Sequence, residues 1–143
     1  MGETGCGPDP DAGYSLPAWT YSDPEFFAVE ARRIFRPSWQ IVAHDSDLPA
    51  PGDFHVLDYL GESIIVIRGD DGEARAFTNV CRHRGARILT EDSGTTGNLV
   101  CGYHSWTYAP DGALIHASAP GEIDFDAGCF ALKRAHCRVV GGL

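Results

Sequence analysis

The sequence lacks any apolar run that approaches the roughly 20 residues needed to cross a bilayer. Its first residues also lack the basic start and apolar stretch of a signal peptide. Neither a membrane span nor export is indicated, so we expect a cytoplasmic protein with reduced thiols. The five cysteines are an odd number, which argues further against an oxidised disulfide framework.

Positive charge is scarce as well. Eleven Lys and Arg residues face 20 Asp and Glu residues, giving a formal net charge of −9. Because nucleic-acid binding requires clustered cations, this balance excludes nucleic acid as an expected partner. The local exception is Arg82, Arg84 and Arg87. They either pair with nearby carboxylates and shape their loop, which we favour, or form a small positive spot where an acidic redox partner docks.

Length and composition indicate one soluble globular domain with a short N-terminal extension: 143 residues, 43% hydrophobic and 22% charged. Residues 1–18 are rich in Gly, Pro, Asp and Thr and predict a mobile leader. Residues 19–38 predict a helical segment, and residues 39–143 predict the main domain.

The helical segment has clear boundary signals. Ser22 or Asp23 is suited to cap a helix, Pro24 fits its first turn, and Pro37 stops it. A stripe of apolar residues recurs at helical spacing: Phe27, Ala31, Ile34 and Phe35. We expect this stripe either to pack in a core or to face a further part of the protein.

From Trp39 onward the pattern changes to short strands rich in Ile, Val, Phe and Tyr. The predicted strands are residues 39–44, 54–59, 63–68, 74–78, 98–101 and 106–109. Turn signals lie at residues 61–62 and 70–73, and residues 109–113 predict a further hairpin. Many short strands separated by turns predict a mainly β fold, an antiparallel sandwich or barrel.

Two short motifs carry the chemistry, CRHRG at residues 81–85 and CGYHSW at residues 101–106. Each offers one thiol and one imidazole at close range: Cys81 and His83 in the first, Cys101 and His104 in the second. Two thiolates and two imidazoles suit a [2Fe–2S] centre with both Cys on one iron and both His on the other. Such a centre transfers single electrons.

Two other assignments compete for these four residues. Two Cys and two His also close a tetrahedral zinc site, although the one-residue gap between Cys81 and His83 is tighter than zinc sites usually have. A disulfide does not require the neighbouring histidines. Three cysteines lie outside the motifs and are expected to be ordinary thiols: Cys6, Cys129 and Cys137.

The two motifs together resemble the N-terminal Rieske domain of the α subunit of Rieske non-haem iron, or ring-hydroxylating, oxygenases. The resemblance covers nearly the whole chain. It extends to flanking stretches at residues 39–44, 48–53, 61–68, 76–80, 106–108 and 111–112. It implies a Rieske fold, an antiparallel β-sandwich or barrel with a short N-terminal helix and two cluster-binding loops. It also implies that Cys81, His83, Cys101 and His104 bind the cluster.

The resemblance implies a function as well. The chain would relay electrons from a ferredoxin or flavin reductase to a mononuclear Fe(II) catalytic domain that it does not contain, within an oligomeric mono- or dioxygenase. No catalytic residue is expected in the chain itself. At residues 138–143 the family continues a strand toward that catalytic domain, so we expect a truncated oxygenase. The alternative is a freestanding Rieske ferredoxin.

Other positions separate members of this superfamily. The cytochrome bc type has a further cysteine in each loop and a serine two residues after the second histidine, where this chain has Ala86, Tyr103 and Trp106. The missing serine hydroxyl predicts a reduction potential toward the low end of the Rieske range, about −150 mV. Tyr108 either donates a hydrogen bond to a cysteine sulfur or packs under the loops. Gly85 and Gly102 are expected to let backbone approach the cluster.

The remaining histidines carry no metal-binding pattern. A mononuclear iron site requires two His and one carboxylate that converge. His44, His55, His116 and His136 stand far apart in the sequence, and we expect them to be surface or capping residues.

Overall fold

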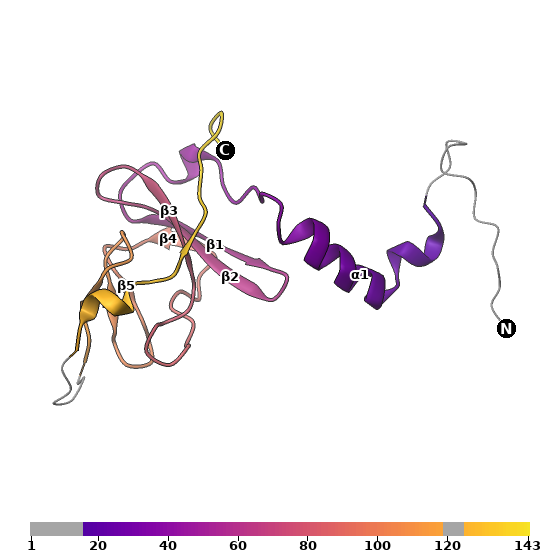
Figure 1. Cartoon of the computed structure of the whole chain (residues 1–143). Coiled ribbons are helices and arrows are strands. Elements are labelled where there is room, and N and C mark those ends of the chain that lie inside the picture. Colours follow the sequence, from indigo (N-terminus) through magenta and orange to yellow (C-terminus); the bar gives the residue numbers. More distant parts are fainter. Residues whose placement is uncertain (1–15, 119–124) are drawn as a thin grey trace. The chain divides into compact units, whose positions relative to one another are not determined.

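A computed structural model describes residues 16–118 and 125–143 of the chain. The chain divides into two compact units, Met1–Gln40 and Ile41–Leu143 (Figure 1). Most of the predicted leader, residues 1–15, lies outside the described residues.

The first unit is helical in its described part. A 3-10 turn, η2 (Ala18–Tyr21), precedes helix α1 (Pro24–Glu30), which continues as a π-helical turn, η3 (Ala31–Phe35). The Asp23 carboxylate accepts hydrogen bonds from the N–H groups of Glu25 and Phe26 at 2.8 and 2.9 Å. Pro24 occupies the first helical position, where its missing N–H is not needed. The predicted cap and helix start are confirmed.

The apolar stripe of this unit forms no buried core. None of residues 16–40 is buried, and Phe27 and Ile34 are 51% and 52% exposed. Phe27 contacts only one ring along the stripe, Phe35, at a centroid distance of 6.2 Å. Within the described part of this unit, Phe27 and Ile34 of the stripe are exposed, whereas Ala31 and Phe35 are partly buried.

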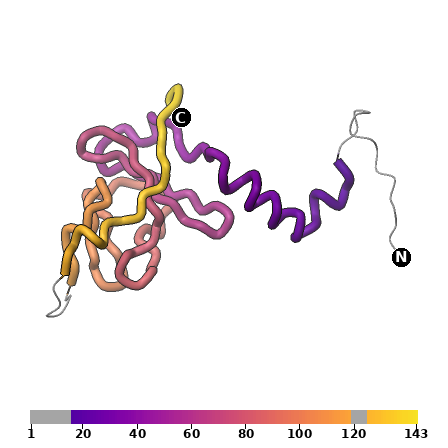
Figure 2. The backbone as a smooth tube through the Cα atoms, viewed as in Figure 1, coloured from indigo at the N-terminus to yellow at the C-terminus, as the bar shows by residue number. Residues whose placement is uncertain are grey.

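The second unit contains two antiparallel sheets (Figures 1 and 2). The larger has the strand order β4-β1-β2-β3-β8 and the smaller β5-β6-β7. Its elements are η4 (Asp45–Asp47), β1 (Asp53–Tyr59), β2 (Glu62–Arg68), β3 (Ala74–Thr78), β4 (Ser93–Thr95), β5 (Leu99–Val100), β6 (Thr107–Tyr108), β7 (Leu114–His116), η5 (Ala127–Phe130) and β8 (Arg134–Ala135). The predicted mainly β, antiparallel fold is confirmed.

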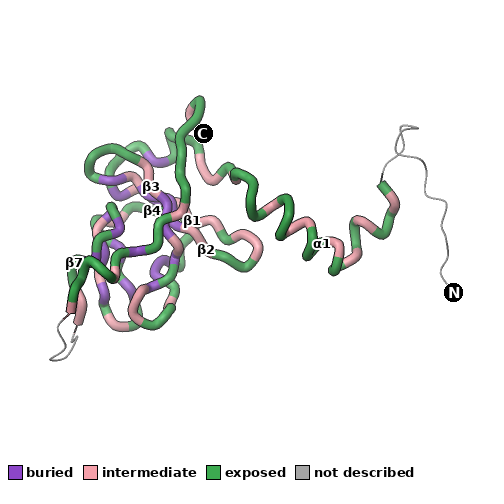
Figure 3. Tube along the Cα trace, in the orientation of Figure 1, coloured by how far each residue is buried: buried purple, intermediate pink, exposed green. Residues whose placement is uncertain are grey.

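The main core lies between the two sheets. It combines residues of the larger sheet with residues of the smaller one: Phe54, Ile65, Ile67 and Phe77 with Leu99, Tyr108 and Leu114. The alternate residues Val66 and Ala76 belong to a second buried cluster with Leu48. Because β2 is buried on both faces, it reads as an uninterrupted apolar run rather than an alternating one (Figure 3).

Tight turns fix the strand register. Tyr59 pairs with Glu62, so Leu60 and Gly61 form the two-residue loop between β1 and β2, one position earlier than predicted. Their φ angles of 51° and 78° are both positive, as a type I′ turn requires. At the β6–β7 hairpin, Gly112 (φ 88°) lies directly beneath the ring of Phe77, where no side chain would fit. The Ala109 N–H donates to Ala113 at 2.9 Å, which confirms the predicted hairpin.

Two predicted extended segments are wrong as strands. Residues 39–44 form no strand, and Trp39 and Ile41 are 69% and 75% exposed. Their apolar character suggested a sheet position, but no described strand pairs with them. The expected C-terminal strand over residues 138–143 is also absent from the described residues. Val140 and Leu143 instead hydrogen-bond each other across Gly141 and Gly142, whose φ angles are positive.

No helix within residues 16–118 or 125–143 is long and apolar enough to span a membrane.

A buried amide braces the segment between β3 and the first motif. Asn79 is 1% exposed, and its Oδ1 accepts hydrogen bonds from the N–H groups of Ile88 and Leu89 at 3.1 and 2.9 Å. Its Nδ2 donates to the Leu89 carbonyl at 2.8 Å and to the Ser63 hydroxyl at 3.1 Å. One side chain thus holds the two ends of the first motif together.

Replacing this amide should destabilise the fold. Asn79→Ala leaves two backbone N–H groups in the core without an acceptor, so we expect the free energy of unfolding to fall by about 2–4 kcal/mol. Urea denaturation followed by circular dichroism measures the change. Asn98→Ala is the matched control at an exposed asparagine, expected to change stability by less than about 0.5 kcal/mol. Equal effects of the two substitutions would contradict the bracing role.

Candidate metal centre

The two motifs fold into loops of the same construction. In each, the N–H of the fifth residue donates to the carbonyl of the first: Gly85 to Cys81 at 3.0 Å and Ser105 to Cys101 at 2.9 Å. The N–H of each cysteine then bonds to the sixth residue: Cys81 to Ala86 at 2.7 Å and Cys101 to Trp106 at 2.8 Å. The first ligand loop (residues 81–86) follows β3, and the second ligand loop (residues 101–106) joins β5 to β6.

The fifth position of each loop requires a left-handed backbone. Gly85 has φ 75°, which glycine adopts without strain. Ser105 has φ 56°, which costs an L-residue about 1–2 kcal/mol. Gly102, which was expected to serve close approach, has no positive φ and no neighbouring atom that a side chain would meet. In the second loop the left-handed backbone conformation is therefore adopted by Ser105 and not by Gly102.

The sulfur end of the site is buried. Cys81 and Cys101 are each 2% exposed, and their thiols interact with each other. Burial raises the pKa of the Cys101 thiol, while the backbone N–H groups of Tyr103 and His104 at its sulfur oppose that rise. These N–H groups are placed to stabilise a thiolate there. Because thiolates bind metals, the site loses protons when a metal binds.

The nitrogen end carries the two imidazoles. The His83 and His104 rings meet edge to face with centroids 4.7 Å apart. Burial lowers the pKa of His83, and the nearby His104 and Arg84 charges lower it further. A lowered pKa favours the neutral imidazole, which is the form that binds metal. The structure thus brings all four predicted residues together.

Tyr108 links the sulfur end to the backbone. Its side chain is fully buried, and its hydroxyl lies 3.3 Å from the Cys81 sulfur. The same hydroxyl accepts the Arg82 N–H at 3.0 Å, which leaves its own proton available to the sulfur. Burial, followed by the contact with Cys81, raises the Tyr108 pKa, so the phenol remains a donor. Tyr108 therefore packs under the loops, and its hydroxyl also contacts a cysteine sulfur; donation to that sulfur stays a prediction.

The donor set fits a [2Fe–2S] cluster. His104 Nδ1 is buried without a hydrogen-bond partner among the described residues, as a metal-binding nitrogen would be. In a [2Fe–2S] centre each iron needs two protein donors, which two thiols and two imidazoles can supply.

The loop arginines divide between the two roles considered for them. Arg87 pairs with Asp58, with its Nη1 at 2.9 and 3.0 Å from the two carboxylate oxygens. This pairing confirms the structural role for Arg87. Arg84 is exposed and close enough to His83 to lower its pKa. Arg84 therefore leaves positive charge at the histidine end.

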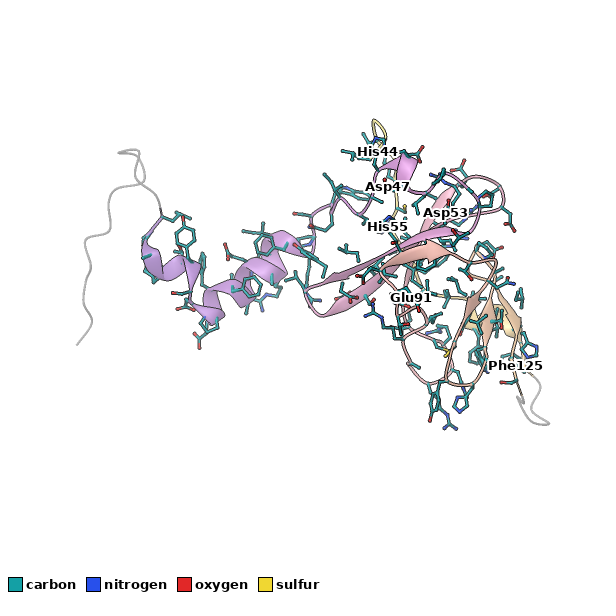
Figure 4. All side chains as sticks on the ribbon, turned by 180° about the vertical axis from the view of Figure 1, so that it is seen from behind. His44, Asp47, Asp53, His55, Glu91 and Phe125 are labelled. Carbon is teal, nitrogen blue, oxygen red and sulfur yellow. The ribbon has the colours of Figure 1, made fainter. Side chains whose placement is uncertain are left out.

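Of the remaining cysteines and histidines, the described cysteines are exposed free thiols and one histidine caps a helical turn. Cys129 and Cys137 are free, while Cys6 lies outside the described residues. His44 caps η4 by accepting the Ser46 N–H at 3.2 Å, as expected for a capping residue. Figure 4 places His44 and His55 at the opposite end of the second unit from Phe125, whose ring contacts Trp106 of the second ligand loop.

Three contacts around the site come from sequence positions that no motif marks. The rings of Phe125 and Phe130 each meet the edge or face of Trp106 at 5.6 Å. The Ser118 hydroxyl donates to the His104 carbonyl. Phe125 and Phe130 lie well beyond the second motif in the sequence, and only the fold shows that they contact Trp106.

The chain matches the model of one protein family, described as the Rieske [2Fe-2S] domain, over residues 38–131. Among curated proteins it is 43% identical over 129 residues to the glycine betaine monooxygenase oxygenase subunit of Chromohalobacter salexigens. It is 39% identical over 126 residues to the large oxygenase component of a 2,4-dinitrotoluene dioxygenase system of Burkholderia sp.. These matches cover 90% and 86% of this chain but only 29% and 28% of those proteins.

Solved structures give the same result. A quaternary ammonium Rieske monooxygenase, CntA, superposes with a TM-score of 0.82 at 35% identity, over 90% of this chain and 36% of that one. Naphthalene 1,2-dioxygenase superposes with a TM-score of 0.81 at 33% identity, over 92% of this chain and 30% of that one. The chain therefore spans about a third of the length of the proteins it matches.

Removing the Tyr108 hydroxyl should lower the reduction potential of the bound cluster. A hydrogen bond to a cluster sulfur favours the reduced state, so Tyr108→Phe should shift the midpoint downward by about 20–60 mV, equivalent to one bond of about 0.5–1.5 kcal/mol. Voltammetry of the reconstituted chain measures the shift. Tyr103→Phe is the matched control, since Tyr103 is 61% exposed. An unchanged midpoint in Tyr108→Phe would refute the sulfur contact.

Exchanging the residues at the fifth loop positions should change stability in opposite directions. Ser105→Gly relieves the left-handed strain and should raise the free energy of unfolding by about 0.5–1 kcal/mol, net of the added freedom of the unfolded chain. Gly85→Ser places a side chain at the equivalent position and should lower it by a similar amount. Thermal unfolding measures both. A loss of stability in Ser105→Gly would contradict the equivalence of the two loops.

Proposed function

This chain belongs to the Rieske [2Fe–2S] domain family, and from that premise we propose that it relays single electrons within a Rieske-type oxygenase. The observation that carries the proposal is the joint position of two buried thiols and two imidazoles on two equivalent loops. We propose Cys81 and Cys101 as ligands of one iron and His83 and His104 as ligands of the other. Bound there, a [2Fe–2S] cluster supplies one-electron transfer.

The residues around the site have defined tasks in this proposal. Tyr108 and the backbone N–H groups of Tyr103 and His104 donate hydrogen bonds to cysteine sulfur and stabilise added negative charge. Burial of both cysteines excludes water from the sulfur end. His83 and His104 are less buried, so the histidine end is the side where electrons exchange with another centre.

The relatives support a task that does not depend on substrate. Their names contain chemically different compounds: glycine betaine and carnitine on one side, dinitrotoluene and naphthalene on the other. All of them nevertheless align with this chain over a similar, limited part of their length. The shared part is therefore best assigned to electron delivery, and we propose that substrate choice and oxygen activation belong to a catalytic domain with mononuclear Fe(II).

We further propose a ferredoxin or flavin reductase as the electron donor and an oligomeric state for the complete oxygenase. Arg84 places an exposed positive charge beside His83 on a chain with a net charge of −9. Because long-range attraction scales with local potential, an acidic donor would be guided toward this end rather than toward the rest of the surface.

Reconstitution tests the cofactor assignment. With ferrous salt and sulfide under anaerobic conditions, the chain should bind about two iron and two sulfide, and EPR after dithionite reduction should give the rhombic signal with low average g that mixed Cys and His ligation produces. His104→Cys should alter that signal and lower the midpoint potential, because a third thiolate adds negative charge. His116→Cys, on strand β7, is the matched control and should leave both unchanged.

Stoichiometric zinc without sulfide would overturn the assignment, and so would an unaltered spectrum in His104→Cys. The relay is separated from a freestanding carrier by stopped-flow measurements of electron exchange. A relay domain should be reduced by an oxygenase reductase and should pass its electron to a supplied catalytic domain carrying Fe(II). Reduction without onward transfer to that domain would favour the ferredoxin-type carrier.

A further inference from the structure

A cluster of aromatic rings lies against the histidine end of the site. The ring of His83 lies parallel to the ring of Trp106, at 9° with centroids 4.8 Å apart. Trp106 is 4% exposed, and Phe125 and Phe130 contact it at steep angles of 77° and 80°, both at 5.6 Å. These two rings also stack on each other at 4.7 Å. His83 is thus backed by three packed rings.

Among the described residues, the indole is oriented by ring packing. Its Nε1 is buried and has no hydrogen-bond partner among the described residues. A tryptophan usually pairs its N–H when it is buried, because the unpaired donor costs free energy. The flat face of the indole instead provides a surface against which a second ring can pack.

His104 is held differently. Its ring is covered by Tyr103, at a centroid distance of 3.8 Å, and Tyr103 is 61% exposed. The backbone of His104 is tied by the Ser118 hydroxyl. One histidine thus packs against a buried, supported ring, and the other beneath a ring that faces solvent.

We propose that Trp106 is a positioning residue that fixes the plane of the His83 imidazole. This inference rests on the proposed role of His83 as a ligand. The ring torsion χ2 of histidine is intrinsically broad, so a metal bond at one nitrogen leaves rotation about that bond weakly determined. Parallel packing against Trp106 removes this freedom, because rotation would drive the imidazole into the indole. A single ring plane gives one geometry for electron transfer at His83.

Nitrogen hyperfine couplings of the reduced cluster report on the two imidazoles separately. In the reconstituted chain, pulsed EPR should resolve two ¹⁴N couplings of similar width. Trp106→Leu should broaden one of them roughly twofold, since the coupling depends on ring orientation. Trp106→Phe keeps a flat ring, so the width of this coupling should stay close to that of the wild type. Phe130→Leu loosens the support of Trp106 without touching His83 and should broaden the same coupling by a smaller amount.

Tyr103→Leu is the matched control, because Tyr103 covers the other imidazole. It should alter only the second coupling. Iron and sulfide contents measured on every sample separate this inference from the proposed function. Full cluster content with two unchanged couplings in Trp106→Leu overturns the positioning role. If Trp106→Leu takes up no cluster, Phe130→Leu decides, and an unchanged width there overturns it. If the wild-type chain takes up no iron and sulfide on reconstitution, both proposals are overturned.

Discussion

The hydroxyl of Tyr108 is the contact on which the geometry of the site depends. The two ligand loops belong to different sheets, the first following β3 of the larger sheet and the second lying between β5 and β6 of the smaller one. Tyr108 stands on β6, yet its hydroxyl accepts the Arg82 N–H and approaches the Cys81 sulfur of the first loop. One buried phenol therefore couples the two sheets at the point where the proposed cluster ligands lie.

Packing in the shared core also holds the two sheets together beneath the loops. Residues of both sheets share one buried cluster that also includes Cys81, Cys101 and Trp106. The cysteines are therefore part of the hydrophobic core as well as of the site. Because packed interiors resist changes of even one methylene, the separation of the two loops is set by the same packing that stabilises the domain. Asn79 completes the support by holding the ends of the first loop.

Sequence patterns predicted the parts of this molecule that local chemistry determines. The apolar run of β2, the cap at Asp23 and the paired Cys and His motifs each carry their own signal, and the structure has the corresponding elements. Residues 39–44 carry a similar apolar signal without a strand to pair with, so the prediction of a strand was wrong. Strands β4 and β8, of three and two residues, were not predicted. The contacts of Phe125 and Phe130 with Trp106 join distant positions, and only tertiary packing decides them.

Two opposing effects set the electronic character of the sulfur end. Burial of Cys81 and Cys101 disfavours added negative charge, because a low-dielectric surrounding stabilises it poorly. The Tyr108 hydroxyl and the backbone N–H groups of Tyr103 and His104 act in the opposite direction. The position two residues after the second histidine, which could add a further hydroxyl, holds Trp106, whose ring instead packs against His83. The low reduction potential expected from this substitution remains a prediction, but its cause is specific: the indole supports the nitrogen end of the site at the expense of a donor to the sulfur end.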